Sequence, residues 1–215
     1  MVDLDISLIQ KSLRYIYELN STLKDFNYNY NSFVENSTCR NAVCMCLLQI
    51  GELTGKLSQE LKNEQPNIEW HLIKGMRNIF AHAYSTLDCI AAWGAATKDV
   101  PKLKEVLQTL EKDFIKSEVK NWPSHEIYNF YSMRNTNLGK SLDSDPYKKN
   151  LKLLSSMLYT ELPPEVAFNV IKNSPDFKNK KIYDEFLKKA LPALSKKPKL
   201  ATSIKNFNKV QDIER

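Results

Sequence analysis

Apolar residues recur along the chain at the three- and four-residue spacing of amphipathic helices. The strongest stripe lies within residues 37–61 and includes Val43, Leu47 and Ile50. Another clean stripe follows Pro101. No stretch alternates between apolar and polar residues for long enough to indicate a sheet, so the pattern predicts an all-α protein.

Breaks in this pattern and capping residues set the expected helix boundaries. Residues 27–31, rich in Asn and Tyr, either extend the first helix or form a turn. Pro66 ends the second helix, and Ser85 with Asp88 three residues later has the form of an N-cap that starts a short helix. The predicted helices are residues 4–23, 37–61, 69–83, a short one from 85, 101–114, 124–133, 146–160, 164–172 and 180–194.

Charge is distributed unevenly between the two ends of the chain. The 31 Lys and Arg outnumber the 25 Asp and Glu, giving a formal net charge of +6. Residues 1–117 hold 13 basic and 14 acidic residues, whereas residues 118–215 hold 18 and 11. We therefore predict a domain over residues 1–117, a boundary at residues 118–123, and a smaller basic helical domain with a frayed tail after Ser195.

Composition argues against several classes of protein. With only 5 Gly, the chain has neither a P-loop nor a Gly-x-Gly-x-x-Gly motif, which disfavours nucleotide-binding folds built on Gly-rich loops. No apolar run approaches 18 residues, so we expect no membrane partner. The segment Met1–Asp5 is acidic where a secretory signal would be basic, so we expect a cytoplasmic protein.

The four cysteines are Cys39, Cys44, Cys46 and Cys89. On a helix, Cys44 and Cys46 lie roughly 200° apart, so they cannot easily share a metal ion or a disulfide. No Cys-x-x-Cys pair occurs. We interpret the cysteines as core residues, with zinc binding as the alternative, and we expect no cofactor.

Four polar residues of complementary chemistry lie close together: Arg77, Asn78, His82 and Tyr84. An imidazole with a pKa near ~6.5 gives or takes a proton at neutral pH, and a guanidinium binds a phosphate through two donors. These groups suit attack on a phosphodiester, and RNA brings its own nucleophile, the 2′-OH, so no metal is needed. The structural alternative is an Arg on a solvated face, a His at a helix end and a Tyr packed in a groove.

The spacing Arg77-x4-His82-x-Tyr84 matches the signature of HepT-like toxins within the HEPN class of helical ribonucleases. The chain resembles this family over about residues 5–117. The resemblance implies a HEPN-like helical bundle and a metal-independent endoribonuclease toxin of a toxin–antitoxin system. It also rests on four further segments, Arg40–Val43, Gln49–Glu52, Ile68–Trp70 and Gly75–Asn78.

The resemblance also implies roles for the motif residues. His82 would transfer protons, Arg77 would bind phosphate and the transition state, and Asn78 would orient them. Tyr84 would receive AMP from a nucleotidyltransferase antitoxin that silences the toxin. Arg77 and His82 of both chains of a homodimer would line one cleft. Five residues along one straight helix leave the Arg77 and His82 side chains about 140° apart, so one straight helix aims them poorly at a single phosphate. A helix that ends near His82, or a second chain that supplies its own copies, would relieve this problem.

Further candidates have weaker signals. Glu52 matches a Gly-Glu position of the family, but it also fits a helix carboxylate paired with a base. Five lysines interleaved with aromatic residues are solvated helix faces by default and RNA-binding residues in the alternative: Lys148, Lys149, Lys152, Lys188 and Lys189. The alternative function for the whole chain is a non-catalytic helical interaction module that binds a nucleotidyltransferase or nucleic acid.

Overall fold

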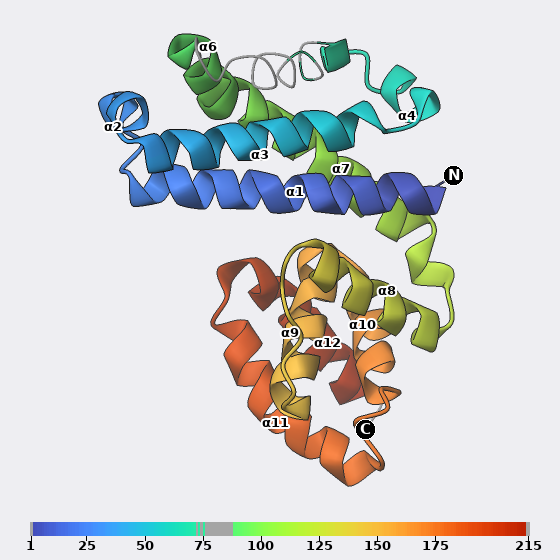
Figure 1. Ribbon diagram of the computed structural model, residues 1–215. Helices are drawn as coiled ribbons and strands as arrows, with labels where there is room; N and C mark the ends of the chain where they lie inside the picture. Colours follow the sequence, from blue (N-terminus) through green and yellow to red (C-terminus); the bar gives the residue numbers. More distant parts are fainter. Residues whose placement is uncertain (1, 72, 74, 76–87, 214–215) are drawn as a thin grey trace. The chain divides into compact units, whose positions relative to one another are not determined.

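The computed structural model describes residues 2–71, 73, 75 and 88–213, and every element assigned within them is helical (Figure 1). The all-α prediction is therefore confirmed. The chain divides into two units, Met1–Leu110 and Glu111–Arg215. Within the described residues, no helix combines the length and the apolar character that crossing a membrane requires.

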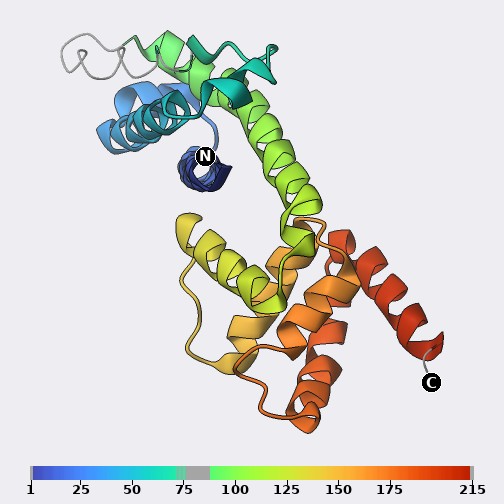
Figure 2. The ribbon, with the colours of Figure 1, turned by 90° about the vertical axis from the view of Figure 1, so that its right-hand side faces the viewer.

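The first unit is built on two long helices that lie side by side, α1 (Val2–Asp25) and α3 (Ser37–Gly55), as Figures 1 and 2 both show. Their apolar stripes face each other, because residues spaced by three and four share one helix face. The fully buried side chains on these stripes are Leu13, Ile16, Leu19, Val43, Leu47 and Ile50.

A turn and a short helix connect α1 to α3. Asn27 and Tyr28 adopt left-handed backbone conformations, with φ of 55° and 51°. The side chain of Asn29 then accepts a hydrogen bond from the Ser32 N–H and caps α2 (Tyr30–Glu35). Residues 27–31 therefore form a turn and the start of a new helix, which decides between the two alternatives.

The helix predicted over residues 37–61 is interrupted. It ends at Gly55, and a separate helix α4 (Gln59–Asn63) begins after Ser58, whose Oγ accepts from the Leu61 N–H at 3.3 Å. The Ser58 N–H donates to Asp5 Oδ1 of α1 at 2.9 Å. The prediction of one continuous helix was wrong because a carboxylate 53 residues away holds the break.

Three helical segments complete the first unit: α6 (Cys89–Gly94), the π-helix η1 (Ala95–Asp99) and the part of α7 (Val100–Ser117) up to Leu110. Asp88 caps α6 by accepting from two backbone N–H groups. Trp93 of α6 packs at 5.7 Å from the Tyr30 ring and 5.5 Å from the Phe33 ring. The N-cap expected at Ser85 lies outside the described residues.

The second unit consists of short helices around its own core. They are η2 (Val119–Asn121), α8 (Ser124–Asn137), α9 (Pro146–Tyr159), α10 (Pro164–Lys172), α11 (Lys180–Ser195) and α12 (Pro198–Ile213). Large buried side chains fill the space between them, among them Tyr131, Leu154, Met157, Phe168, Phe186 and Leu194.

The tail that we expected to fray after Ser195 instead forms α12, which contacts α9, α10 and α11 (Figure 2). Leu200, Ile204 and Phe207 are buried in the core of the second unit, and Phe207 stacks on Phe168 at 3.7 Å. Their spacing of four and three residues makes one apolar face, which outweighs the basic composition of the segment. The domain boundary expected at residues 118–123 stays a prediction.

Candidate active site

The residues predicted to carry the chemistry, Arg77, Asn78, His82 and Tyr84, lie outside the described residues. What the structure gives is the scaffold on either side of them in the chain. On one side this scaffold ends with the segment that contains Trp70 and Ile73, and on the other it resumes at Asp88.

The approach to the motif is tied to α4. The Trp70 indole N–H donates to two backbone carbonyls, those of Lys62 at 3.2 Å and Gln65 at 3.3 Å. Ile73 is buried, with 7% of its surface exposed. These two residues lie seven and four positions before Arg77, so the fold fixes the chain up to this point.

An open pocket of about 770 Å³ lies beside this approach in the first unit. Its lining includes Gln59, Lys62, Asn63, Trp70 and His71. Lys62 Nζ donates to the Gly55 carbonyl at 2.8 Å, and Gln59 Nε2 donates to Asn63 Oδ1 at 2.9 Å. The pocket therefore combines an indole, side-chain amides, an imidazole and the Lys62 ammonium group a few residues before the motif, and no spacing signal in the sequence pointed to it.

The other segments that carry the family pattern lie on α3. Ile50 and Gly51 are buried in the first unit, and Glu52 is half-buried beside them. Arg40 is half-buried and donates to the Val34 carbonyl, which links α3 to α2. These residues support the scaffold, and the part in catalysis expected of Glu52 stays a prediction.

The cysteines lie in or near the core of the first unit. Cys39 and Cys46 are buried, and Cys44 and Cys89 are half-buried. Burial raises the pKa of Cys44 to about 12 and that of Cys46 to about 11. Both thiols are thus protonated at neutral pH and are poor metal ligands. Among the described residues, no group of three His, Cys, Asp or Glu side chains is placed to hold a metal ion.

The five candidate lysines of the second unit have different environments. Lys149 lies 2.7 Å from Asp176 Oδ2, and its pKa is raised chiefly by this hydrogen-bonded pair. Lys152 Nζ donates to the Ser141 carbonyl. Only the remaining three, Lys148, Lys188 and Lys189, are exposed.

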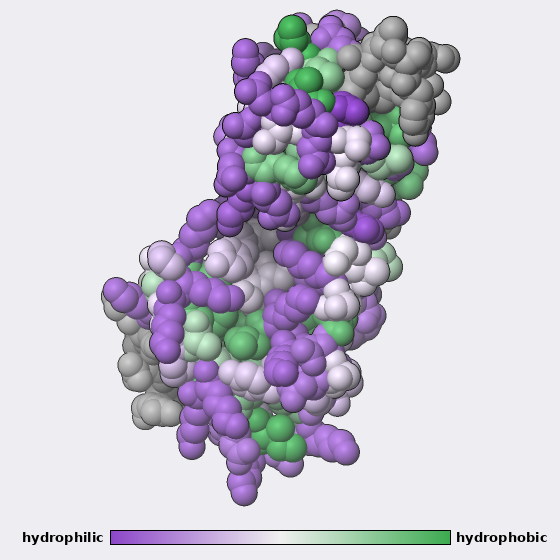
Figure 3. All heavy atoms as spheres, turned by 60° about the vertical axis from the view of Figure 1, so that its left-hand side comes forward, coloured by the Kyte–Doolittle hydropathy of each residue, from purple (hydrophilic) through white to green (hydrophobic). Residues whose placement is uncertain are grey.

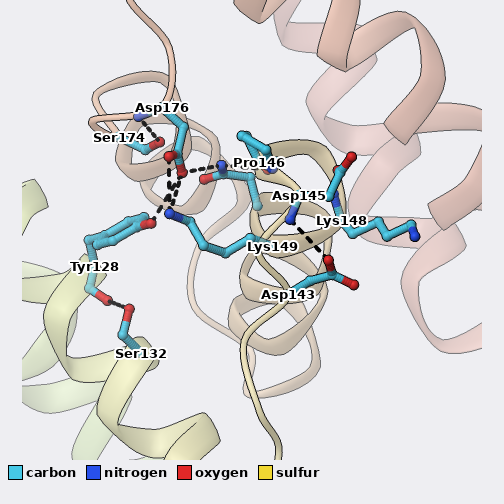
Figure 4. A network of polar contacts seen from close by, with 10 residues as sticks. Tyr128, Ser132, Asp143, Asp145, Pro146, Lys148, Lys149, Ser174 and Asp176 are labelled. Carbon is cyan, nitrogen blue, oxygen red and sulfur yellow. Dashed lines mark hydrogen bonds and ion pairs between the residues drawn. The ribbon is translucent and has the colours of Figure 1, made fainter.

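Figure 4 shows the network around Lys149. Its ammonium group points at the Asp176 carboxylate and lies beside the Tyr128 hydroxyl, whereas Lys148 points away. Asn150 Nδ2 also donates to Asp176 at 2.8 Å. Partial burial by itself would raise the pKa of Asp176, but the hydrogen bonds from Lys149 and Asn150 lower it below its ordinary value. Asp176, 27 residues from Lys149, had no spacing signal that could identify it as a partner.

Lys149→Ala should therefore destabilise the second unit, by about 1–3 kcal/mol, because it leaves the partly buried Asp176 carboxylate without its cation. Lys148→Ala, the neighbouring exposed lysine, should change stability by no more than about 0.5 kcal/mol. Urea unfolding measures both effects through Trp122 fluorescence, in a background where Trp70 and Trp93 are Phe. Equal losses in the two variants would show that the network does not stabilise the fold.

The first unit is similar in sequence to known proteins. The "Ribonuclease HepT-like" family model matches residues 13–110. The chain is 30% identical over 99 residues to "Putative RNase MJ1380" of Methanocaldococcus jannaschii, a match that covers 44% of this chain and 91% of that protein. It is 27% identical over 104 residues to "Putative RNase MJ0125" of the same organism, covering 46% of this chain and 90% of that protein.

A further relative is "Probable ribonuclease HepT" of Thermococcus cleftensis, 29% identical over 83 residues, or 39% of this chain and 76% of that protein. No solved structure matches the chain significantly. The family match lies within the first unit and contains the segments on α3, the approach through Trp70 and the whole Arg77–Tyr84 motif. Through residues 13–110, the chain belongs to the HepT-like ribonuclease family.

Proposed function

We propose that this protein is a metal-independent endoribonuclease toxin of a toxin–antitoxin pair, and that Arg77 and His82 carry the cleavage. The observation that supports the proposal is an intact Arg77-x4-His82-x-Tyr84 string within the residues that match the ribonuclease family. A non-catalytic member could lose the Arg or the His without harm to its fold, and this chain keeps both.

The chemistry needs only groups that the chain and the RNA supply. His82 takes the proton of the ribose 2′-OH, whose oxygen attacks the neighbouring phosphorus and displaces the 5′-oxygen of the next nucleotide. A cyclic phosphate forms, and the leaving oxygen takes up a proton. Arg77 donates two hydrogen bonds to the phosphate and stabilises the charge that grows on it, while Asn78 orients the reacting groups.

A homodimer fits this chemistry. One histidine removes a proton from the nucleophile, and a second can protonate the leaving oxygen in the same turnover. Each chain has one His82, so two chains supply both groups. The angle of about 140° between Arg77 and His82 along one helix also favours a site that takes residues from two copies.

Tyr84 is the proposed point of control. A nucleotidyltransferase antitoxin would transfer AMP from ATP to the Tyr84 hydroxyl oxygen and release pyrophosphate. The new phosphodiester carries a negative charge two residues from His82, where it competes with RNA phosphate for Arg77.

The decisive experiment is RNA cleavage by the purified full-length chain in EDTA. We expect cleavage of a mixed RNA substrate, and we expect it to stop after incubation with the nucleotidyltransferase and ATP. Intact-mass analysis followed by peptide mapping should then locate one AMP on Tyr84.

Each arm of this experiment has an outcome against the proposal. An inactive wild-type chain without any adduct would favour the non-catalytic interaction module. Activity that survives stoichiometric modification, or an adduct on another residue, would remove Tyr84 from its role.

A further inference from the structure

Helix α11 of the second unit has two faces of opposite character. Tyr183, Phe186, Ala190 and Leu194 are buried and fall within an arc of about 80° around the helix axis. This arc faces the core of the second unit. Figure 3 shows that the surface of this unit, in the lower half of the view, is mostly hydrophilic with smaller hydrophobic patches.

Four lysines lie on the opposite side, three of them within α11 and the fourth, Lys196, at its C-cap. Lys181, Lys188, Lys189 and Lys196 are exposed and lie within an arc of about 100°, centred about 150° from the buried arc. Lys181 is two turns from Lys188, and Lys189 is two turns from Lys196, so the row extends for about 22 Å. We call these four residues the α11 lysine row. Glu185 is the one acidic residue within its arc.

The lysine row differs from other lysines of the same unit. Lys149 is paired with Asp176, and Lys197 donates to Ser155 Oγ at 3.0 Å while lying 5.8 Å from the Tyr159 ring centre. No hydrogen bond or ion pair joins a side chain of the row to another residue that the structure describes, Glu185 included. Four ammonium groups therefore line one helix face, none of them held in an ion pair or hydrogen bond within the described part of the unit.

A row of this kind complements a chain of phosphates better than it complements a folded protein surface. Lysine is a flexible point charge that suits phosphate oxygens, and phosphate contacts supply most of the sequence-independent affinity for nucleic acid. The aromatic residues that could stack on bases, Tyr183 and Phe186, face the core instead. Binding on this face should therefore not depend on base sequence.

We propose that the α11 lysine row binds the phosphate backbone of an RNA strand. The choice of RNA rests on the proposed ribonuclease function of the first unit, whereas the anionic, sequence-independent character of the ligand follows from the row itself. The contact would hold substrate RNA on the chain and raise its local concentration without taking part in cleavage.

The test measures RNA affinity in the full-length chain carrying His82→Ala, so that bound RNA stays intact. Fluorescence anisotropy with a labelled single-stranded RNA gives Kd between 50 and 200 mM salt. Replacing all four lysines of the row with Gln should reduce the slope of log affinity against log salt by about 3, since each single-strand phosphate contact contributes about 0.7. A second RNA of equal length and different sequence should bind with the same Kd within about twofold.

A matched variant removes the same charge elsewhere in the unit. Lys120, Lys172, Lys199 and Lys205 are exposed on η2, α10 and α12, and their replacement with Gln should change the slope by less than about 1. Glu185→Gln should tighten binding about two- to threefold, because it removes the acid inside the row. Circular dichroism verifies that each variant is folded.

Equal slopes for the two quadruple variants would overturn the proposal, since net charge rather than the row would then attract RNA. An effect of the row on binding to phosphatidylserine vesicles but not to RNA would overturn it too, in favour of a membrane surface. The proposed function is tested separately: a wild-type chain that binds RNA through the row yet cleaves none would retain this inference and lose that one.

Discussion

Replacement of His82 by Ala is expected to lower the rate of RNA cleavage in EDTA by about 10²–10⁴-fold, the usual contribution of a positioned general acid or base. If a homodimer uses one His82 to activate the 2′-OH and the other to protonate the leaving oxygen, one substitution removes both groups, so the loss should lie toward the upper end. Single-turnover cleavage of a labelled RNA with enzyme in excess measures this loss, because binding and product release then do not limit the rate.

Two further variants test whether the loss of cleavage is specific to the proposed site. His125→Ala is the matched control, since His125 lies in the second unit with 77% of its side chain exposed, and it should cleave at the wild-type rate. Arg77→Lys keeps the positive charge but loses the two-donor geometry, so we expect partial activity between wild type and His82→Ala. Cleavage by His82→Ala at the rate of His125→Ala would remove His82 from the mechanism.

Local sequence signals predict three helices of the second unit well, and the reason is visible in their first residues. The predicted helices at 146–160, 164–172 and 180–194 agree with α9, α10 and α11 to within one residue at each end. Asp145 caps α9, Asn179 caps α11, and Pro164 opens α10. Capping side chains and N-terminal prolines act within one turn of the helix, so the start of a helix can be predicted from a few neighbouring residues.

Other features depend on contacts between distant residues and could not be predicted in this way. The break between α3 and α4 needs Asp5, which is close to Ser58 only after α1 and α3 have packed. The π-helix η1 shows no clear pattern in its residues Ala95–Asp99. The helix α12 is a different case, because the spacing of its buried apolar residues was present in the sequence and the basic composition obscured it.

Among the candidate functional residues, too, some could be proposed from local sequence and others depend on packing. Arg77, His82 and Tyr84 could be proposed from the sequence because their residue types and spacing match the family signature, and their roles stay predictions. The lysines could not be sorted from the sequence, because Lys149 and Lys188 occur in similar surroundings along the chain. Only packing distinguishes the lysine that is paired with Asp176 from the one that faces away from the core.

Arg134→Met should destabilise the second unit by about 3–5 kcal/mol, the largest effect on stability that we expect of a single substitution here. Arg134 makes two hydrogen bonds of 2.7 Å to the Glu111 carboxylate and one of 2.8 Å to Ser156 Oγ. The two side chains of the ion pair are only 9% and 3% exposed. Methionine fills much of the same volume but leaves Glu111 buried without a cation. Urea unfolding followed by Trp122 fluorescence, in the background where Trp70 and Trp93 are Phe, measures the loss.

The loss of stability in Arg134→Met should arise because the ion pair is buried, and the loss of an exposed ion pair should cost much less. Lys116 lies 2.6 Å from Glu161, but these side chains are 49% and 46% exposed, so Lys116→Met should cost no more than about 1 kcal/mol. Adding Glu111→Leu to Arg134→Met removes the stranded carboxylate and should restore most of the stability, because an apolar pair of similar volume often replaces a buried ion pair without loss. If the double variant is as unstable as Arg134→Met alone, the unpaired charge on Glu111 is not the cause of the instability. The Arg134 guanidinium would then stabilise the unit through its hydrogen bond to Ser156 and its packing.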